Sequence, residues 1–336
     1  MSETQVEHQT LPIIGHQAAT AFFSRVLSHD QLSHAYLITG PQHIGKTTLA
    51  TQFAQALLCG KNPACGMCIP CRQFIQGIHP DVSWVNREQS EATDALKKNI
   101  SIEQIRQLQS RAYLSSFGGT YKVIIITEAH TLSLEAANAL LKTLEEPTAK
   151  TVLLLLATHE KLLPATVVSR CQLIRLQPVA DQHIYEQLMA RGIERKKARQ
   201  AAAASYGLPG RAITLATDID VATALRQQVR DFITFVQQDL SGRFAFAASF
   251  TADVDREGVI AQLRLWKALL RDIALIQHGS MSYLAHQFAS HELEQLAGRY
   301  QAAQLYALIE RLQQAEADVA ANVTPRLVLE HLALHF

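Results

Sequence analysis

Short apolar runs alternate with amphipathic segments in the first half of the chain. In the segments around 49–57 and 134–144, apolar residues recur at spacings of three and four, which is the period of an α-helix. Ser133 is the expected N-cap of the second helix. Strands separated by helices indicate βαβ units around a parallel sheet covered on both faces. The predicted strands lie at residues 35–39, 82–85, 123–126, 152–156 and 173–176.

The pattern changes at Pro178, after which only helices are predicted. Three short helices come first, at 181–190, 195–205 and 211–216, with breaks at Gly207, Pro209 and Gly210. From about Asp218 to the end, apolar residues form stripes at helical spacing. These stripes are Leu225, Val229, Phe232, Ile233 and Val236; Leu263, Trp266, Leu269, Leu270 and Ile273; and Leu305, Leu308, Ile309 and Leu312.

The composition is that of a globular protein with little excess charge. The chain has 336 residues, which suggests two or three domains, and 48% of them are hydrophobic. The net charge is +1 and no run of basic residues stands out. Proteins that grip DNA alone usually carry a clearer basic excess. This balance favours proteins as the main partners.

No targeting or membrane-spanning segment is expected. The first ten residues are polar and acidic, unlike a signal peptide. The longest apolar runs, such as 152–157, have the length of a strand and are too short to span a bilayer. We therefore expect a cytoplasmic protein without a membrane partner.

A complete phosphate-binding loop follows the first predicted strand. Residues 40–47, Gly-Pro-Gln-His-Ile-Gly-Lys-Thr, match G-x-x-x-x-G-K-[ST] between a strand and a helix. Gly40 and Gly45 let the backbone N–H groups converge on a phosphate, while Lys46 reaches the β- and γ-phosphates. The Thr47 hydroxyl can ligate Mg²⁺, and Thr48 completes the predicted nucleotide site. Possible cofactors are therefore ATP and Mg²⁺; the alternative is a relic loop that no longer binds nucleotide.

The second acidic motif of an ATPase is impaired. A P-loop ATPase holds Mg²⁺ with a carboxylate at the end of a neighbouring strand. After the strand at 123–126, Thr127 occupies the position where an aspartate is expected, and a hydroxyl carries no charge. Glu128 stands where a general base would sit. A catalytic base and a solvated carboxylate without a catalytic role are about equally expected for Glu128.

Four of the five cysteines lie close together, at Cys59, Cys65, Cys68 and Cys71. In a reducing compartment such spacing indicates a metal before disulfides. Four thiolates suit a closed, structural zinc site without catalytic function. An iron–sulfur cluster and four free thiols are the alternatives.

Several motifs together resemble the clamp-loader AAA+ family, over about residues 11–334. A zinc module inserted after the P-loop helix is also typical of the bacterial members. The motifs are Ile13-Ile-Gly-His16, His34-Ala-Tyr-Leu37, Asn138-Ala-Leu-Leu-Lys-Thr-Leu-Glu-Glu-Pro147, Leu156-Ala-Thr158, Ser169-Arg-Cys171 and Asn322-Val-Thr-Pro-Arg-Leu327.

The resemblance implies an α/β AAA+ fold, in which a RecA-like parallel sheet with a P-loop precedes a small helical lid and an all-α collar. The expected domains are 1–177 with the zinc module at 59–71, 178–218 for the lid, and 219–336 for the collar that joins subunits in a ring.

The resemblance also implies roles for three further residues. Thr158 belongs to the sensor 1 strand. Arg170 of the Ser-Arg-Cys motif would act in trans, as an arginine finger at a neighbour's ATP. Arg211 lies where a sensor 2 element would face a γ-phosphate. The alternatives are a surface ion pair for Arg170 and a solvated helix-start arginine for Arg211.

Thr127 favours the delta-prime branch of the family, whose own site often decays. The implied partners are the delta and gamma/tau subunits, with the sliding clamp and primed DNA reached through the complex. We expect weak or absent ATPase activity in the chain itself. One alternative is an ATP-hydrolysing motor subunit of the gamma/tau type. Another is a stand-alone zinc-dependent DNA-binding protein.

Overall fold

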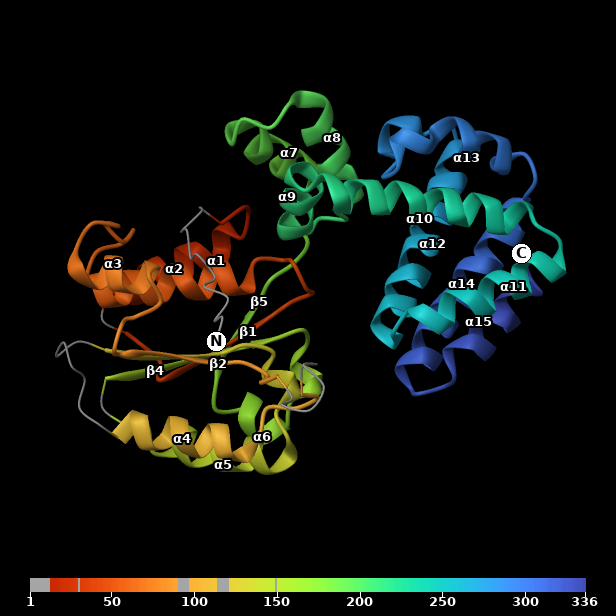
Figure 1. Ribbon diagram of the computed structural model, residues 1–336. Coiled ribbons are helices and arrows are strands. Elements are labelled where there is room, and N and C mark those ends of the chain that lie inside the picture. The colour runs from red at the N-terminus through yellow and green to blue at the C-terminus, as the bar shows by residue number, and fades with distance from the viewer. Residues whose placement is uncertain (1–12, 30, 90–96, 114–120, 149) are drawn as a thin grey trace. The chain divides into compact units, whose positions relative to one another are not determined.

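The computed structural model describes residues 13–29, 31–89, 97–113, 121–148 and 150–336 (Figure 1). The chain divides into two compact units. The first comprises Met1–Val179 and Leu208–Gly210, and the second Ala180–Gly207 and Arg211–Phe336. The first twelve residues of the domain expected over 1–177 lie outside the described residues. The boundary expected at 218 between lid and collar stays a prediction.

The first unit is built on a parallel sheet of five strands in the order β2-β3-β4-β1-β5. Every strand coincides with a predicted apolar run to within one residue at each end. The strands are β1 (Ala35–Thr39), β2 (Val82–Val85), β3 (Lys122–Ile126), β4 (Thr151–Ala157) and β5 (Gln172–Arg175).

Helices cover both faces of this sheet (Figure 1). On one face lie α1 (Gln17–Ser28), α2 (Lys46–Cys59) and α3 (Ile69–Ile75); on the other lie α4 (Ile102–Tyr113), α5 (Leu134–Glu145) and α6 (Ala165–Val168). Alternate residues of each strand enter the two cores. Tyr36 and Ile38 of β1 pack on the first face, while Ala35 and Leu37 pack on the second. Because both faces are buried, the strands read as continuous apolar runs.

Two short 3₁₀ turns, η1 (Ala129–Thr131) and η2 (Glu160–Leu162), follow β3 and β4. The predicted N-cap of α5 is confirmed, because the Ser133 side chain accepts a hydrogen bond from the Ala136 N–H.

The second unit is helical throughout the residues described. Its third helix begins at Pro209, two residues earlier than predicted, because proline fits the first turn of a helix. The first two residues of this helix belong to the first unit. Its elements are α7 (Asp181–Ala190), α8 (Arg195–Ala204), α9 (Pro209–Thr217), α10 (Ile219–Gln237), α11 (Leu240–Asp253), α12 (Arg256–Gln277), η3 (Met281–Tyr283), η4 (Gln287–Ala289), α13 (Ser290–Ala297), α14 (Ala302–Ala320) and α15 (Pro325–Ala333).

The core of the second unit surrounds α12. All five residues of the stripe predicted at 263–273 are buried there. Phe235 is also fully buried, with its ring centroid 4.5 Å from that of Trp266, although the predicted stripe on α10 omitted it.

An α/β unit with a P-loop, followed by helices, confirms the expected AAA+ fold class. Among the described residues, no helix is both long and apolar enough to cross a membrane.

Candidate functional site

The predicted phosphate loop lies between the end of β1 and the start of α2. The Gly40 N–H donates to the Ala157 carbonyl at 3.2 Å, which ties the loop to β4. A Cβ on Gly40 would lie 2.9 Å from the Leu176 carbonyl oxygen, so a larger residue would push the backbone apart. Gly45 precedes α2 with φ 109°, a conformation that side chains rarely adopt. Both glycines are therefore required by the backbone path.

Lys46 folds back over this loop. Its Nζ donates to the Gly40 carbonyl at 2.7 Å and to the Pro41 carbonyl at 2.8 Å. Burial lowers the pKa of Lys46 to about 8, while the negative charge of Glu128 acts in the opposite direction. Thr47 is exposed and Thr48 half-buried in the first turn of α2. The Lys46 ammonium group and the Thr47 and Thr48 hydroxyls thus lie at the N-terminus of α2, where a phosphate can bind.

The ends of β2 and β3 carry a polar cluster. The Thr127 hydroxyl donates to Asn86 Oδ1 at 2.6 Å. The Glu128 carboxylate accepts from Arg87 Nε at 2.8 Å and from Arg87 Nη2 at 3.1 Å. The single guanidinium of Arg87 therefore binds the Glu128 carboxylate with two hydrogen bonds and neutralises its charge.

Sequence reasoning missed Asn86 and Arg87. The parallel register pairs Val85 with Ile126, so the residues that follow these two strands meet at the same edge of the sheet. The signal available was a pair of polar residues directly after the strand at 82–85.

The sheet order brings most of the predicted nucleotide residues together. Strand β4 lies between β1 and β3. The phosphate loop follows β1 and Thr127 follows β3, so Thr158, which follows β4, comes from the strand between them. Arg211 lies in the second unit, where its guanidinium carbon is 4.8 Å from the centroid of the Tyr206 ring.

Two further contacts hold the phosphate loop from outside. His16 Nε2 lies 2.9 Å from the Ile44 carbonyl, and burial lowers the pKa of His16. The Gly210 N–H donates to the His43 carbonyl at 2.8 Å. A Cβ on Gly210 would lie 2.9 Å from that carbonyl oxygen, so this approach is open to glycine alone. Sequence reasoning had placed Gly210 in a helix break without this role.

Arg170 follows α6 and contacts α5 and α6. Its Nη2 lies 2.7 Å from Glu145 Oε1, and its Nη1 donates to the Thr166 carbonyl at 3.0 Å. The Arg170 side chain is 37% exposed and that of Glu145 is 50% exposed. Exposed ion pairs of this kind contribute about 0 to 1 kcal/mol, so the guanidinium is free to change partner. The neighbouring Cys171 is a separate thiol whose pKa burial raises to about 12.

The four clustered cysteines converge between α2 and α3. Their sulfur atoms all lie within 4.8 Å of one another, with Sγ–Sγ distances of 3.5 Å for Cys59–Cys65, 3.7 Å for Cys59–Cys68 and 4.0 Å for Cys65–Cys71. A tetrahedron with zinc–sulfur bonds of about 2.3 Å has sulfur–sulfur edges of about 3.8 Å. The donor set therefore fits a closed tetrahedral site.

The thiols of the cluster differ in acidity. The backbone N–H groups of Met67 and Cys68 lower the pKa of the Cys65 thiol to about 6. Burial raises the pKa of Cys71 to about 12. A cation coordinated by Cys71 would hold it as a thiolate.

Comparison with known proteins identifies the family. The family described as "DNA polymerase III, delta subunit" matches residues 15–180, and "DNA polymerase III, delta subunit, C terminal" matches 224–336. The DNA polymerase III subunit delta' of Bacillus subtilis is 28% identical over 312 residues, which are 92% of each chain. The chain belongs to the DNA polymerase III delta-prime family. This membership covers both units.

Other relatives match this chain over shorter segments. The subunit delta' of Pseudomonas aeruginosa is 38% identical over 154 residues, 45% of each chain. The subunit tau of Bacillus subtilis is 35% identical over 175 residues, 51% of this chain and 30% of tau. The matches thus span less than half the length of these two relatives. A gamma subunit-related protein of Thermotoga maritima superposes with a TM-score of 0.48 at 15% identity, covering 93% of this chain and 97% of that one.

Proposed function

We propose that the chain is a non-motor, delta-prime-type subunit of a clamp loader. In this role it would support the ATP-dependent loading of a sliding clamp onto primed DNA during replication, in a complex with delta and gamma/tau subunits. The observation that carries the proposal is the alignment with a delta' subunit over 92% of both chains. A motor subunit of the gamma/tau type is the alternative, since tau relatives also match.

The chemistry at the ends of β2 and β3 favours the non-motor role. Thr127 offers Mg²⁺ a neutral hydroxyl, which is occupied by Asn86. The candidate base Glu128 is held by two hydrogen bonds from Arg87. A general base must be free to accept a proton from the attacking water. We therefore infer that Gly40, Gly45, Lys46, Thr47, Thr48 and Thr158 bind nucleotide with little hydrolysis.

The same proposal assigns Arg170 to a neighbour's active site. The exposed pair with Glu145 leaves the guanidinium near the surface, where a second subunit could approach it. An arginine supplied in trans stabilises charge on the transferred phosphoryl group. Arg211, stacked on Tyr206, is proposed as the sensor 2 arginine.

We further propose that Cys59, Cys65, Cys68 and Cys71 hold a structural Zn²⁺. The support is the near-tetrahedral set of sulfur distances. The metal would order the loop between α2 and α3 and would take no part in hydrolysis.

Reconstitution tests the proposed function. The chain is mixed with delta and gamma/tau subunits, sized, and assayed for clamp- and DNA-stimulated ATP hydrolysis. Arg170→Ala should assemble normally and lose roughly 10³-fold or more of the rate at the adjacent motor site, and less of the total rate. The matched control is Arg175→Ala, another exposed arginine in an ion pair, with Glu160.

Lys46→Ala separates the two clamp-loader roles. A non-motor subunit should tolerate this change far better than Arg170→Ala. The reverse ranking, or rapid hydrolysis by the pure chain, would identify a motor subunit. Gel shifts by the isolated chain that require the zinc module, together with failure to assemble, would favour the stand-alone DNA-binding protein.

A further inference from the structure

Helix α8 is divided into a basic half and an alanine half. Its sequence is Arg-Lys-Lys-Ala-Arg-Gln-Ala-Ala-Ala-Ala, without an acidic residue. The alanines Ala198, Ala201, Ala202 and Ala204 are buried against the rest of the second unit. All four basic residues are exposed: Arg195, Lys196, Lys197 and Arg199.

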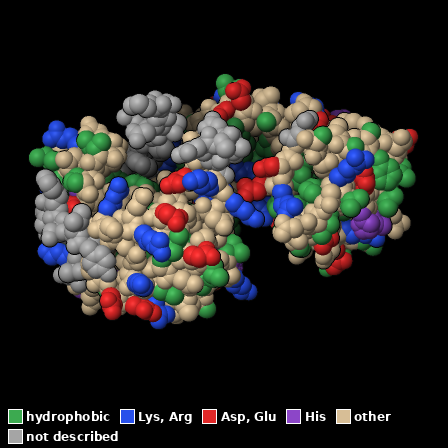
Figure 2. Space-filling view, turned by 60° about the horizontal axis from the view of Figure 1, so that its bottom comes forward, with side chains coloured by type: hydrophobic (Ala, Val, Ile, Leu, Met, Phe, Trp, Pro, Cys, Tyr) green, Lys and Arg blue, Asp and Glu red, His purple; other side chains and the backbone are tan. Residues whose placement is uncertain are grey.

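These four cations have no partner. Within the part of the chain that the structure describes, none of them forms an ion pair or a hydrogen bond. On the face seen in Figure 2, by contrast, basic and acidic side chains are interspersed. The accumulation on α8 is thus local in a chain whose net charge is only +1.

The arrangement is unfavourable for the helix itself. Arg195, Lys196 and Lys197 occupy the first turn, where the helix dipole disfavours positive charge. The first turn has no acidic residue, and the N-cap Glu194 makes no side-chain capping bond. Helix stability therefore does not account for these three cations.

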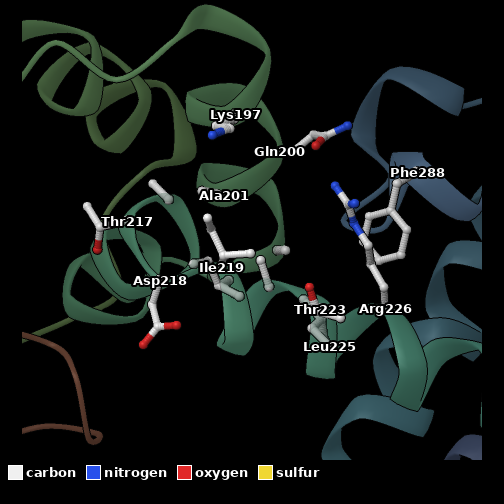
Figure 3. A pocket seen from close by; sticks show the side chains of 14 residues that line it. Lys197, Gln200, Ala201, Thr217, Asp218, Ile219, Thr223, Leu225, Arg226 and Phe288 are labelled. Atoms are coloured by element: carbon white, nitrogen blue, oxygen red, sulfur yellow. The ribbon is translucent and has the colours of Figure 1, made fainter.

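A cavity of about 350 Å³ is lined by residues of both α8 and α10 (Figure 3). Lys197 from α8 and Arg226 from α10 both line it, and the Arg226 guanidinium lies 5.8 Å from the centroid of the Phe288 ring. Asp218 is the one carboxylate in the lining. It caps α10 by accepting from two backbone N–H groups, and Figure 3 shows it pointing away from Lys197 and Arg226.

We propose that the basic half of α8, with Arg226, binds the phosphate backbone of DNA. Helix α8 itself offers charge without an apolar centre, since no large hydrophobic residue of this helix is exposed, and the large apolar residues of the cavity come from other elements. Protein interfaces usually bury an apolar core, whereas phosphate binding relies on cations and counterion release. Arg195 and Arg199 lie one turn apart on one face, and their planar forks match phosphate oxygens.

The choice of DNA over other polyanions rests on the proposed function, in which the complex acts on primed DNA. The expectation that no run of basic residues stands out is wrong, because four of the five residues at 195–199 are basic. The sequence does not show that the alanine half is buried or that the cations lack partners.

Fluorescence anisotropy of the full chain with a short fluorescein-labelled primer–template at low salt tests the proposal. The test variant combines Lys196→Ala, Lys197→Ala and Arg199→Ala. The control combines Arg230→Ala, Arg264→Ala and Arg326→Ala, which removes the same charge from exposed arginines that have side-chain partners. The test variant should lose about tenfold or more in affinity, and the control less than twofold.

The salt dependence adds a second readout, in which the charge-matched control should leave the slope unchanged. The slope of log affinity against log salt should fall by about 0.9 for each phosphate that the variant no longer neutralises. The α8 variant should keep or raise its melting temperature, because alanine is a strong helix former and the dipole conflict is removed. Equal losses in both variants, or no binding by the wild-type chain, would overturn the proposal. Binding of polyglutamate but not DNA would assign the surface to an acidic protein.

Assembly separates this inference from the proposed function. The α8 variant should enter the complex with delta and gamma/tau like the wild type. If the wild-type chain does not assemble, the proposed function fails. If assembly is normal and the α8 variant binds DNA unchanged, this inference alone is wrong.

Discussion

Arg87 holds the Glu128 carboxylate with two hydrogen bonds, of 2.8 and 3.1 Å, across the ends of β2 and β3. The Arg87 side chain is 21% exposed and that of Glu128 is 36% exposed. The pair stands beside Thr127, where an ATPase would carry a carboxylate for Mg²⁺. Under the proposed function, two features therefore oppose hydrolysis here: the candidate base is engaged in hydrogen bonds, and the candidate metal position carries no charge.

Thr127→Asp should restore an anchor for Mg²⁺. Asn86 can turn its amide to donate to the new carboxylate, in place of accepting from the Thr127 hydroxyl. Calorimetry should give about tenfold tighter Mg²⁺–ATP binding, which corresponds to about 1.4 kcal/mol. Thr127→Asn is the uncharged control and should give no gain. An equal gain for Thr127→Asp in EDTA would contradict the metal explanation.

ATP affinity should depend on pH through Lys46. Burial lowers the pKa of Lys46 to about 8, and a phosphate beside it would raise that pKa. Binding is therefore fully favoured below pH 8 and weakens as the pH rises above 8, by up to about tenfold per pH unit. Isothermal titrations from pH 7 to 10 measure this. Lys46→Arg stays charged, so its affinity should be flat with pH; a flat profile for the wild type would refute the prediction.

The proposed zinc should depend on the clustered cysteines alone. Cys65→Ser should lose the metal, measured by elemental analysis as about one Zn²⁺ per chain in the wild type. Proteolysis should become faster between residues 60 and 70, while the sheet remains folded because its cores do not include Cys65. Cys171→Ser is the matched control and should keep the metal. Metal-free protein after gentle purification would contradict the proposed zinc site.

A buried polar chain should stabilise the second unit. Tyr206 Oη lies 2.9 Å from His286 Nε2, and His286 Nδ1 lies 2.9 Å from Asp272 Oδ2. His286 and Asp272 are fully buried. His286→Ala should cost about 2 to 5 kcal/mol, because it removes a fully buried side chain and one of the three hydrogen bonds that the Asp272 carboxylate makes. Tyr206→Phe should cost about 1 to 3 kcal/mol, because one buried nitrogen loses its hydrogen bond.

Hydrogen exchange in urea over residues 181–336 measures both costs for this unit. The control is Tyr283→Phe, since the Tyr283 side chain is exposed. A silent His286→Ala would show that the buried chain of hydrogen bonds contributes nothing.

Much of the fold follows from local sequence alone. Continuous apolar runs predicted all five strands, and the period of 3.6 residues predicted α2 and α5 of the first unit and the helical character of the second, because burial imposes these patterns on neighbouring residues. The phosphate loop and the four cysteines are equally local. Each is a short stretch whose residue types and spacing already determine which groups converge.

The tertiary structure decided the contacts between distant residues. Arg87 meets Glu128, and Tyr206 meets His286, at sequence separations of 41 and 80 residues. No local period encodes such pairs, because they depend on strand register and helix packing. The same reason applies to α8: the sequence predicted a helix there, whereas only the folded second unit decided that its four cations face solvent without partners.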